Sequence, residues 1–218
     1  MINKDYILRL AEQIGYELSI VLRLRKRNLH EDELLAIDNL LLKYTGMTSR
    51  FINSLSDETL LQSLSPLGKL NVESSLWIAS LLKEEGEAYS ALNNSRESYY
   101  RYTKSLFILL EILHQEHVAF DSDLYEDAAN LIAKLADYEL PAHLEQKLFR
   151  YYEQKGMYAQ AENILFDYLE HHPAPGMIEA GRAFYGRLQE KSSTDLELGN
   201  FSQEEIHEGI EQLKAFEV

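Results

Sequence analysis

Two pairs of histidines have spacings that could suit a metal ion. His114 and His117 are three residues apart, so on a helix they share one face, with Glu111 one turn before. A third close ligand and the His-Glu-x-x-His zinc pattern are absent. The pair His171-His172 ends an expected helix, where a protonated histidine stabilises the helix dipole. We interpret both pairs as surface, interface or capping residues and expect no metal site.

Two clusters of glutamates could support acid–base chemistry if burial shifted the pKa of one member. They comprise Glu84, Glu85 and Glu87, and Glu204, Glu205 and Glu208. Both fall on polar helical stretches, so we expect solvated faces. The sequence also lacks cysteine, Gly-rich phosphate loops and the Gly-x-Ser-x-Gly elbow. We therefore predict a protein that is not an enzyme and has no cofactor.

Aromatic side chains are the remaining candidates, as contacts for a partner. The chain has 14 tyrosines and a single tryptophan. Trp77 is interpreted as a core or interface anchor. The aromatic run over residues 99–107 could line a concave binding groove or pack between repeats. The candidate partner-binding residues are Trp77, Tyr89, Tyr99, Tyr102 and Tyr152.

The elements that would position these residues are all helices. Apolar residues recur at steps of three and four, sustained β alternation is absent, and only four prolines and ten glycines interrupt the chain. A final helix is expected after Ser202, which forms a capping box with Glu205, and residues 191–200 are expected to form a polar loop. The other expected helices cover 3–27, 31–45, 49–55, 57–64, 72–92, 95–117, 122–138, 142–155, 158–171 and 177–190, with a break at 120–121.

The first expected helix ends in a basic cluster, formed by Arg23, Arg25, Lys26 and Arg27. Cations at a helix C-terminus are stabilised by the helix dipole, and this is the interpretation we favour. A patch for a membrane surface or a partner is the alternative.

The segment from Leu144 to Pro173 resembles the tetratricopeptide repeat (TPR). A large residue is followed by Tyr152, then a turn at Gly156, then a small residue at Ala161 that allows close helix approach. Pro173 ends the unit. Two positions depart from the repeat pattern: Glu145 stands where a large residue such as Trp is usual, and Phe149 where Gly or Ala is usual.

A second copy of this pattern lies 63 residues upstream. The residues Gly86, Tyr89, Asn93, Ser98, Tyr102 and Leu106 have the same offsets as Phe149, Tyr152, Gly156, Ala161, Leu165 and Leu169. Asparagine tolerates the left-handed turn conformation, and the separation is close to two repeats of about 34 residues. A third, weaker copy falls around 177–215. The fold prediction is therefore all-α, with TPR-like antiparallel hairpins stacked as a short solenoid after an N-terminal helical hairpin.

The two ends of the chain resemble an uncharacterised bacterial family of small TPR-like proteins over the full length. The resemblance is carried by Tyr6-Ile7-Leu8-Arg9 with Glu12-Gln13, and by Leu198, Phe201-Ser202 and Glu204-Glu205-Ile206. It implies a fold and brings no catalytic motif.

Charge and hydropathy limit the partners and the compartment. Lys and Arg total 21 against 36 Asp and Glu, a formal charge of −15. Such a surface disfavours nucleic acids and anionic membranes. The N-terminus lacks the pattern of a signal peptide, and the densest apolar stretch, 106–113, is too short to cross a bilayer. We therefore expect a cytoplasmic protein.

The expected organisation is an N-terminal helical segment at 1–70 and a TPR-like region at 71–218, as one continuous structural unit. Stacked hairpins form a concave face, so the leading hypothesis is an adaptor that binds an unknown protein or peptide. A self-associating homodimer paired through the first helix is the second hypothesis. A small-molecule sensor with a pocket between helices is the third.

Overall fold

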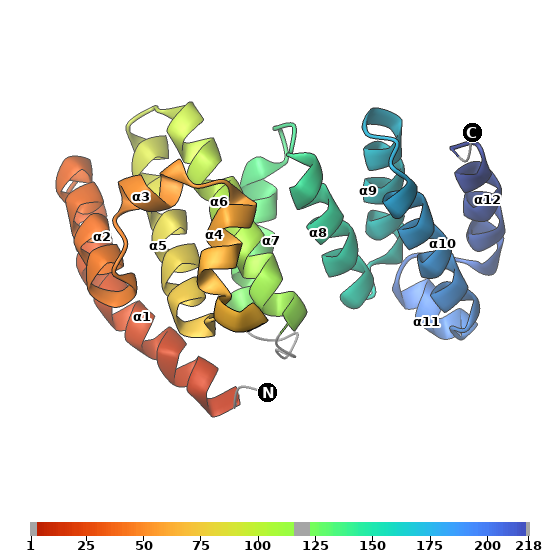
Figure 1. The fold of residues 1–218 in the computed structure, drawn as a ribbon, viewed down its shortest axis with the longest axis horizontal. Coiled ribbons are helices and arrows are strands. Elements are labelled where there is room, and N and C mark those ends of the chain that lie inside the picture. The colour runs from red at the N-terminus through yellow and green to blue at the C-terminus, as the bar shows by residue number, and fades with distance from the viewer. Residues whose placement is uncertain (1–3, 116–122, 217–218) are drawn as a thin grey trace. The chain divides into compact units, whose positions relative to one another are not determined.

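The computed structural model describes residues 4–115 and 123–216, which form twelve α-helices and no strand (Figure 1). The predicted all-α class is confirmed. The chain divides into two compact units, Met1–Tyr138 and Glu139–Val218. The expected helix end near residue 117, the break at 120–121 and His117 lie outside the described residues.

Unit 1 is organised around two long and largely buried helices. Its elements are α1 (Lys4–Lys26), α2 (His30–Thr45), α3 (Ser49–Ser54), α4 (Asp57–Leu64), a 3-10 turn (Pro66–Gly68), α5 (Val72–Ala91), α6 (Ser95–Gln115) and α7 (Asp123–Leu135). Helix α5 packs against α1, α2 and α6, and α6 packs against α7 (Figure 1). Because α5 contacts the N-terminal hairpin, unit 1 continues past the boundary expected at residue 70 and ends at Tyr138.

The α1–α2, α5–α6 and α8–α9 hairpins share one turn geometry. Each has a residue with positive φ at the turn: Asn28 (56°), Asn93 (58°) and Gly156 (73°). In each, the amide of the next residue donates to the carbonyl five residues earlier, the bond of a Schellman cap. These bonds are Leu29 N to Leu24 O at 3.1 Å, Asn94 N to Tyr89 O at 2.9 Å and Met157 N to Tyr152 O at 2.9 Å.

The shared turn matches the 63-residue offset found between Asn93 and Gly156. The sequence pattern missed the copy at Asn28. The position equivalent to Ala161 in this copy is Glu33, a large acidic residue where the pattern requires a small one. Glu33 is nevertheless fully buried, and Ser98 and Ala161 at the equivalent positions are buried too. The equivalent position is therefore buried in all three hairpins.

Unit 2 contains α8 (Ala142–Gln154), α9 (Tyr158–His171), α10 (Pro175–Gln189), α11 (Ser193–Leu198) and α12 (Gln203–Lys214). Its core joins the inner faces of α9, α10 and α12 around Leu165, Phe184 and Ile206. Two expectations are corrected. Pro175 starts α10 instead of preceding it, because proline fits the first helical position. The expected loop 191–200 contains α11, which Ser192 caps by accepting from the Asp195 amide at 3.1 Å.

Candidate partner-binding surface

The five predicted partner-binding residues lie in different environments. Trp77 is fully buried and stacks on Tyr44, with ring centroids 3.8 Å apart. Tyr102 is also buried, whereas Tyr89, Tyr99 and Tyr152 are half-buried. Trp77 therefore anchors the core between α2 and α5 and presents no surface to a partner.

Tyr102 is a packing residue of the α5–α6 hairpin. Its ring lies directly over Gly86, where a Cβ atom would be 2.5 Å from Tyr102 Cε1. Burial and the neighbouring carboxylate of Glu87 raise the pKa of Tyr102 well above its ordinary value. The phenol therefore stays neutral, and the missing side chain at Gly86 leaves room for its ring between the two helices.

Tyr99 belongs to an aromatic cluster that is open to solvent. Its ring centroid lies 5.4 Å from that of Tyr100 in an edge-to-face arrangement and 5.2 Å from that of Tyr138. Tyr100 is 47% exposed and Tyr138 is 43% exposed. The Arg96 guanidinium lies 5.9 Å from the Tyr100 ring centroid. We call Tyr99, Tyr100, Tyr138 and Arg96 the aromatic cluster.

The sequence pattern identified only part of this cluster. Tyr99 was predicted as a contact residue, and Tyr100 stood in the same aromatic run. Tyr138 was missed because it follows α7, 39 residues from Tyr99, and no local spacing connects the two positions. Only the packing of α6 and α7 brings them together.

Buried charges join α6 to α3 and α5. Glu85 on α5 accepts from Ser49 Oγ at 2.5 Å and pairs with Arg101 Nε at 3.0 Å. Arg101 also pairs with Glu97 at 2.9 Å and lies 5.1 Å from the Tyr89 ring centroid. Burial raises the pKa of Glu85, and Arg101 and Ser49 oppose that shift. The expectation of a solvated face is wrong here, because Glu84 and Glu85 are both buried.

A second ionic group joins α1, α2, α5 and α7. Arg25 Nη2 pairs with Glu33 at 2.5 Å and with Glu84 at 2.7 Å. Lys83 next to Glu84 donates to Asp127 at 2.6 Å. Buried carboxylates need such partners, since an unpaired charge in the interior is costly. Arg25 thus has a structural role that the helix-dipole interpretation of the basic cluster did not include.

The remaining glutamates and histidines form no comparable site in the described parts of the chain. Glu204, Glu205 and Glu208 are exposed on α12, as expected. The ring of His171 bonds the Asp167 carbonyl at 2.7 Å, which raises the pKa of His171. Among residues 4–115 and 123–216, no group of three or more metal-ligating side chains comes together.

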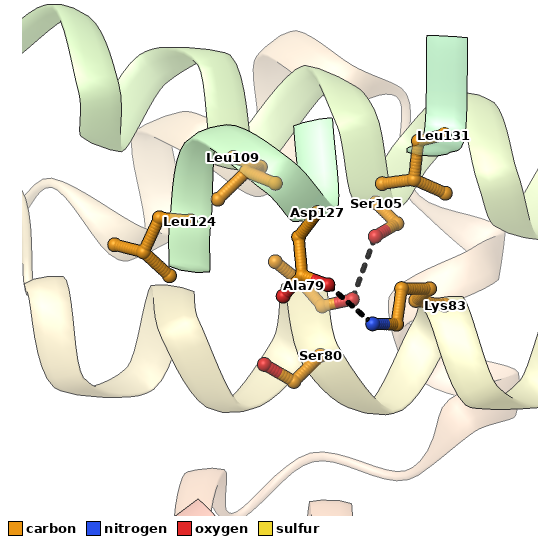
Figure 2. A pocket seen from close by; sticks show the side chains of 8 residues that line it. All are labelled: Ala79, Ser80, Lys83, Ser105, Leu109, Leu124, Asp127 and Leu131. Atoms are coloured by element: carbon orange, nitrogen blue, oxygen red, sulfur yellow. Dashed lines mark hydrogen bonds and ion pairs between the residues drawn. The ribbon is translucent and has the colours of Figure 1, made fainter. Parts of the chain in front are cut away.

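A small cavity lies between α5, α6 and α7 (Figure 2). Its volume is about 10 Å³, the space that a single water molecule needs. Figure 2 shows Lys83 directed at Asp127, and Ser105 Oγ donates to the Ala79 carbonyl at 2.6 Å. The lining residues are Ala79, Ser80, Lys83, Ser105, Leu109, Leu124, Asp127 and Leu131. This cavity is too small for the ligand of a small-molecule sensor.

Comparisons with known proteins give a family without an assigned activity. The model of a family of unknown function, DUF6483, matches residues 1–217. No curated protein and no solved structure matches the chain. Within the part of the chain that the structure describes, none of the helices has the length and apolar character needed to cross a membrane.

Proposed function

The chain belongs to the family of unknown function DUF6483, and from its structure we propose a TPR-like interaction module that binds a segment of a partner protein. The repeated hairpin turn at Asn28, Asn93 and Gly156 supports the TPR-like part of this proposal. Hairpins of one geometry are the building units of helical-repeat proteins, which commonly bind peptides. We place the protein in the cytoplasm as an adaptor.

The observation that carries the proposal is the exposed aromatic cluster. Tyrosine and arginine are enriched where protein interfaces form, because each combines a large contact area with a polar end. Tyr100 and Tyr138 leave much of their rings in water although both pack on Tyr99. Pre-packed rings lose little side-chain entropy on binding, which favours affinity.

The chemistry of the cluster indicates the kind of segment that it binds. The three rings offer apolar faces, and Arg96 adds a cation beside them. We infer a partner segment with an apolar or aromatic anchor next to a carboxylate, since arginine pairs well with carboxylates. The overall charge of −15 disfavours nucleic acid as the partner.

Affinity capture from the native cytoplasm, followed by mass spectrometry, tests the proposal. The wild-type chain is compared with Tyr100→Ala/Tyr138→Ala, and Leu198→Ala on α11 serves as the control because Leu198 is exposed in the other unit. We expect proteins that the wild type and the control retain and the double variant loses. With a purified partner, the double variant should weaken binding by about tenfold or more.

Unchanged binding by a folded Tyr100→Ala/Tyr138→Ala variant would refute the assignment of this surface. Melting temperatures should verify folding. Each ring packs on Tyr99, so its removal should cost about 1 kcal/mol, a loss that a folded domain tolerates. Arg96→Glu provides a second variant, and it should weaken binding if the partner contributes a carboxylate.

A further inference from the structure

Four large apolar side chains of the α1–α2 hairpin are at least half exposed in the described part of the chain. They are Tyr16 (78% exposed), Ile20 (52%), Leu35 (62%) and Leu42 (51%). Tyr16 and Ile20 are one turn apart on α1, and Leu35 and Leu42 are two turns apart on α2. We call these four residues, with Arg23 and Asp32, the outer face of the hairpin.

The outer face points away from the core of unit 1. On α2, the side facing the core carries the buried residues Ile37 and Leu41, and Tyr44 stacks on Trp77 of α5. Residues 35 and 42 lie on the opposite side of a helix with 3.6 residues per turn. Figure 1 shows α2 at one edge of unit 1, with α5 beside it.

The two stripes of the outer face also carry opposite charges at matching positions. On α1 the order is Tyr16, Ile20, Arg23, with steps of four and three; on α2 it is Asp32, Leu35, Asn39, Leu42, with steps of three, four and three. Arg23 and Asp32 are exposed, and neither makes an ion pair with another residue in the described parts of the chain.

From this pattern we propose that the outer face binds a second copy of the same chain. If α1 of one copy runs antiparallel to α2 of the other, with Ile20 opposite Leu35, then Arg23 lies opposite Asp32. Tyr16 then lies opposite Asn39, between Leu35 and Leu42. The same contacts form twice about a two-fold axis parallel to the helices, giving a four-helix arrangement with antiparallel neighbours.

The area of the outer face sets the expected affinity of the dimer. The outer face covers residues 16–23 of α1 and 32–42 of α2. These are about 12 Å and about 16 Å of helix about 10 Å wide, so the face presents roughly 300 Å² per copy. The total of about 600 Å² lies below the roughly 1,000 Å² of a stable specific interface and is typical of a weak, transient one. The dimer should therefore form reversibly and dissociate on dilution.

Sedimentation equilibrium of the full chain, from low micromolar to several hundred micromolar, tests the proposal. We expect the mass to rise from one chain to two and to stop there. Ile20→Lys/Leu35→Lys should remain a single chain throughout. Leu198→Lys replaces a more exposed leucine in unit 2 and should associate like the wild type. A wild type that stays a single chain, a mass that grows past two, or an Ile20→Lys/Leu35→Lys variant that still dimerises would overturn it.

A mixing experiment tests the register without depending on apolar substitutions. Arg23→Glu places a carboxylate opposite Asp32 of the second copy, and Asp32→Arg places two arginines opposite each other. Each variant alone should dimerise at least about fivefold more weakly than the wild type. A mixture should regain wild-type association, because one contact then pairs the introduced glutamate with the introduced arginine and the other keeps the native Arg23 and Asp32. A mixture no stronger than the separate variants would rule out this arrangement.

Discussion

At the scale of single residues, Glu145 sets a pH dependence in unit 2. It stands at the repeat position where a large apolar residue is usual, and its Oε2 atom is buried without a hydrogen-bond partner among the described residues. Burial raises the pKa of this carboxyl above the ordinary value of 4.5, and His172 and His171 oppose the shift. The folded state therefore favours the protonated form of Glu145. The contribution of this carboxyl to the free energy of unfolding is fully present below pH 4.5 and is lost as the pH rises through the raised pKa.

Replacing Glu145 by glutamine should therefore stabilise the protein at neutral pH. The neutral amide removes the unfavourable ionisation. Solvent screens this partly exposed carboxyl, so we expect a gain of only about 0.5 kcal/mol at about pH 7 and little gain near pH 4. Urea denaturation at both pH values measures this difference. The exposed Glu179→Gln on α10 is the control, and an equal gain at both pH values would contradict the ionisation argument.

Arg25 stabilises unit 1 because its guanidinium neutralises two buried carboxylates. Replacing Arg25 by methionine keeps the apolar stem but leaves Glu33 and Glu84 without their shared cation. We expect a loss of about 3 kcal/mol in the free energy of unfolding, because unpaired buried charges are costly. Chemical denaturation should show this loss, while Arg50→Met on the exposed face of α3 should change stability by less than about 0.5 kcal/mol.

The sequence could not reveal the ion pairs of Glu84 and Glu85, for a physical reason. Glu84 and Glu85 are neighbours in a run of charged residues, which is the usual mark of a solvated helix face. Their partners Arg25, Ser49 and Arg101 come from three other helices. Charge patterning along one helix cannot report pairing between helices.

At the scale of elements, the hairpin turn was the most predictable feature. Gly156 and Asn93 are residue types that accept a left-handed backbone, and both adopt positive φ. Helix boundaries followed from caps such as Ser202, whose hydroxyl accepts from the Glu205 amide at 3.2 Å. The helix α11 was missed because its six residues are too few to show helical periodicity.

Gly156→Ala should weaken the α8–α9 hairpin. A Cβ at φ of 73° is strained, and we expect a loss of about 1 kcal/mol in the free energy of unfolding. Gly186→Ala on α10 is a matched control in the same unit, since a Cβ there meets no atom within 4 Å. Because alanine favours helix, the control should gain about 0.5–1 kcal/mol. Losses at both positions would point to something other than turn strain.

At the scale of the whole molecule, the division into two units should be visible in the exchange of backbone amides. Each unit has its own core, so a local destabilisation should stay within the unit that carries it. We expect Gly156→Ala to increase hydrogen exchange in residues 139–216 and to leave 4–115 unchanged. Mass spectrometry of peptic fragments measures this, and faster exchange in both units would indicate a single cooperative structure.

The division itself was beyond the reach of the sequence pattern. The prediction placed a boundary near residue 70, where Ser65-Pro66 and Gly68 interrupt the helices. Those residues form only a short turn, and the chain then returns in α5 to pack against the first hairpin. The observed boundary falls at Tyr138–Glu139, just before Pro141. Local breakers mark turns, whereas long-range packing decides which turns separate units.

The contact between Gly86 and Tyr102 has a consequence for how this family can diverge. A Cβ at position 86 would lie 2.5 Å from Tyr102 Cε1, so no larger residue fits at 86 while the ring keeps its place. Relatives that carry alanine or serine at position 86 should carry a smaller side chain at 102, and those that keep the ring should keep glycine. The residue types at positions 86 and 102 should therefore be correlated across the family.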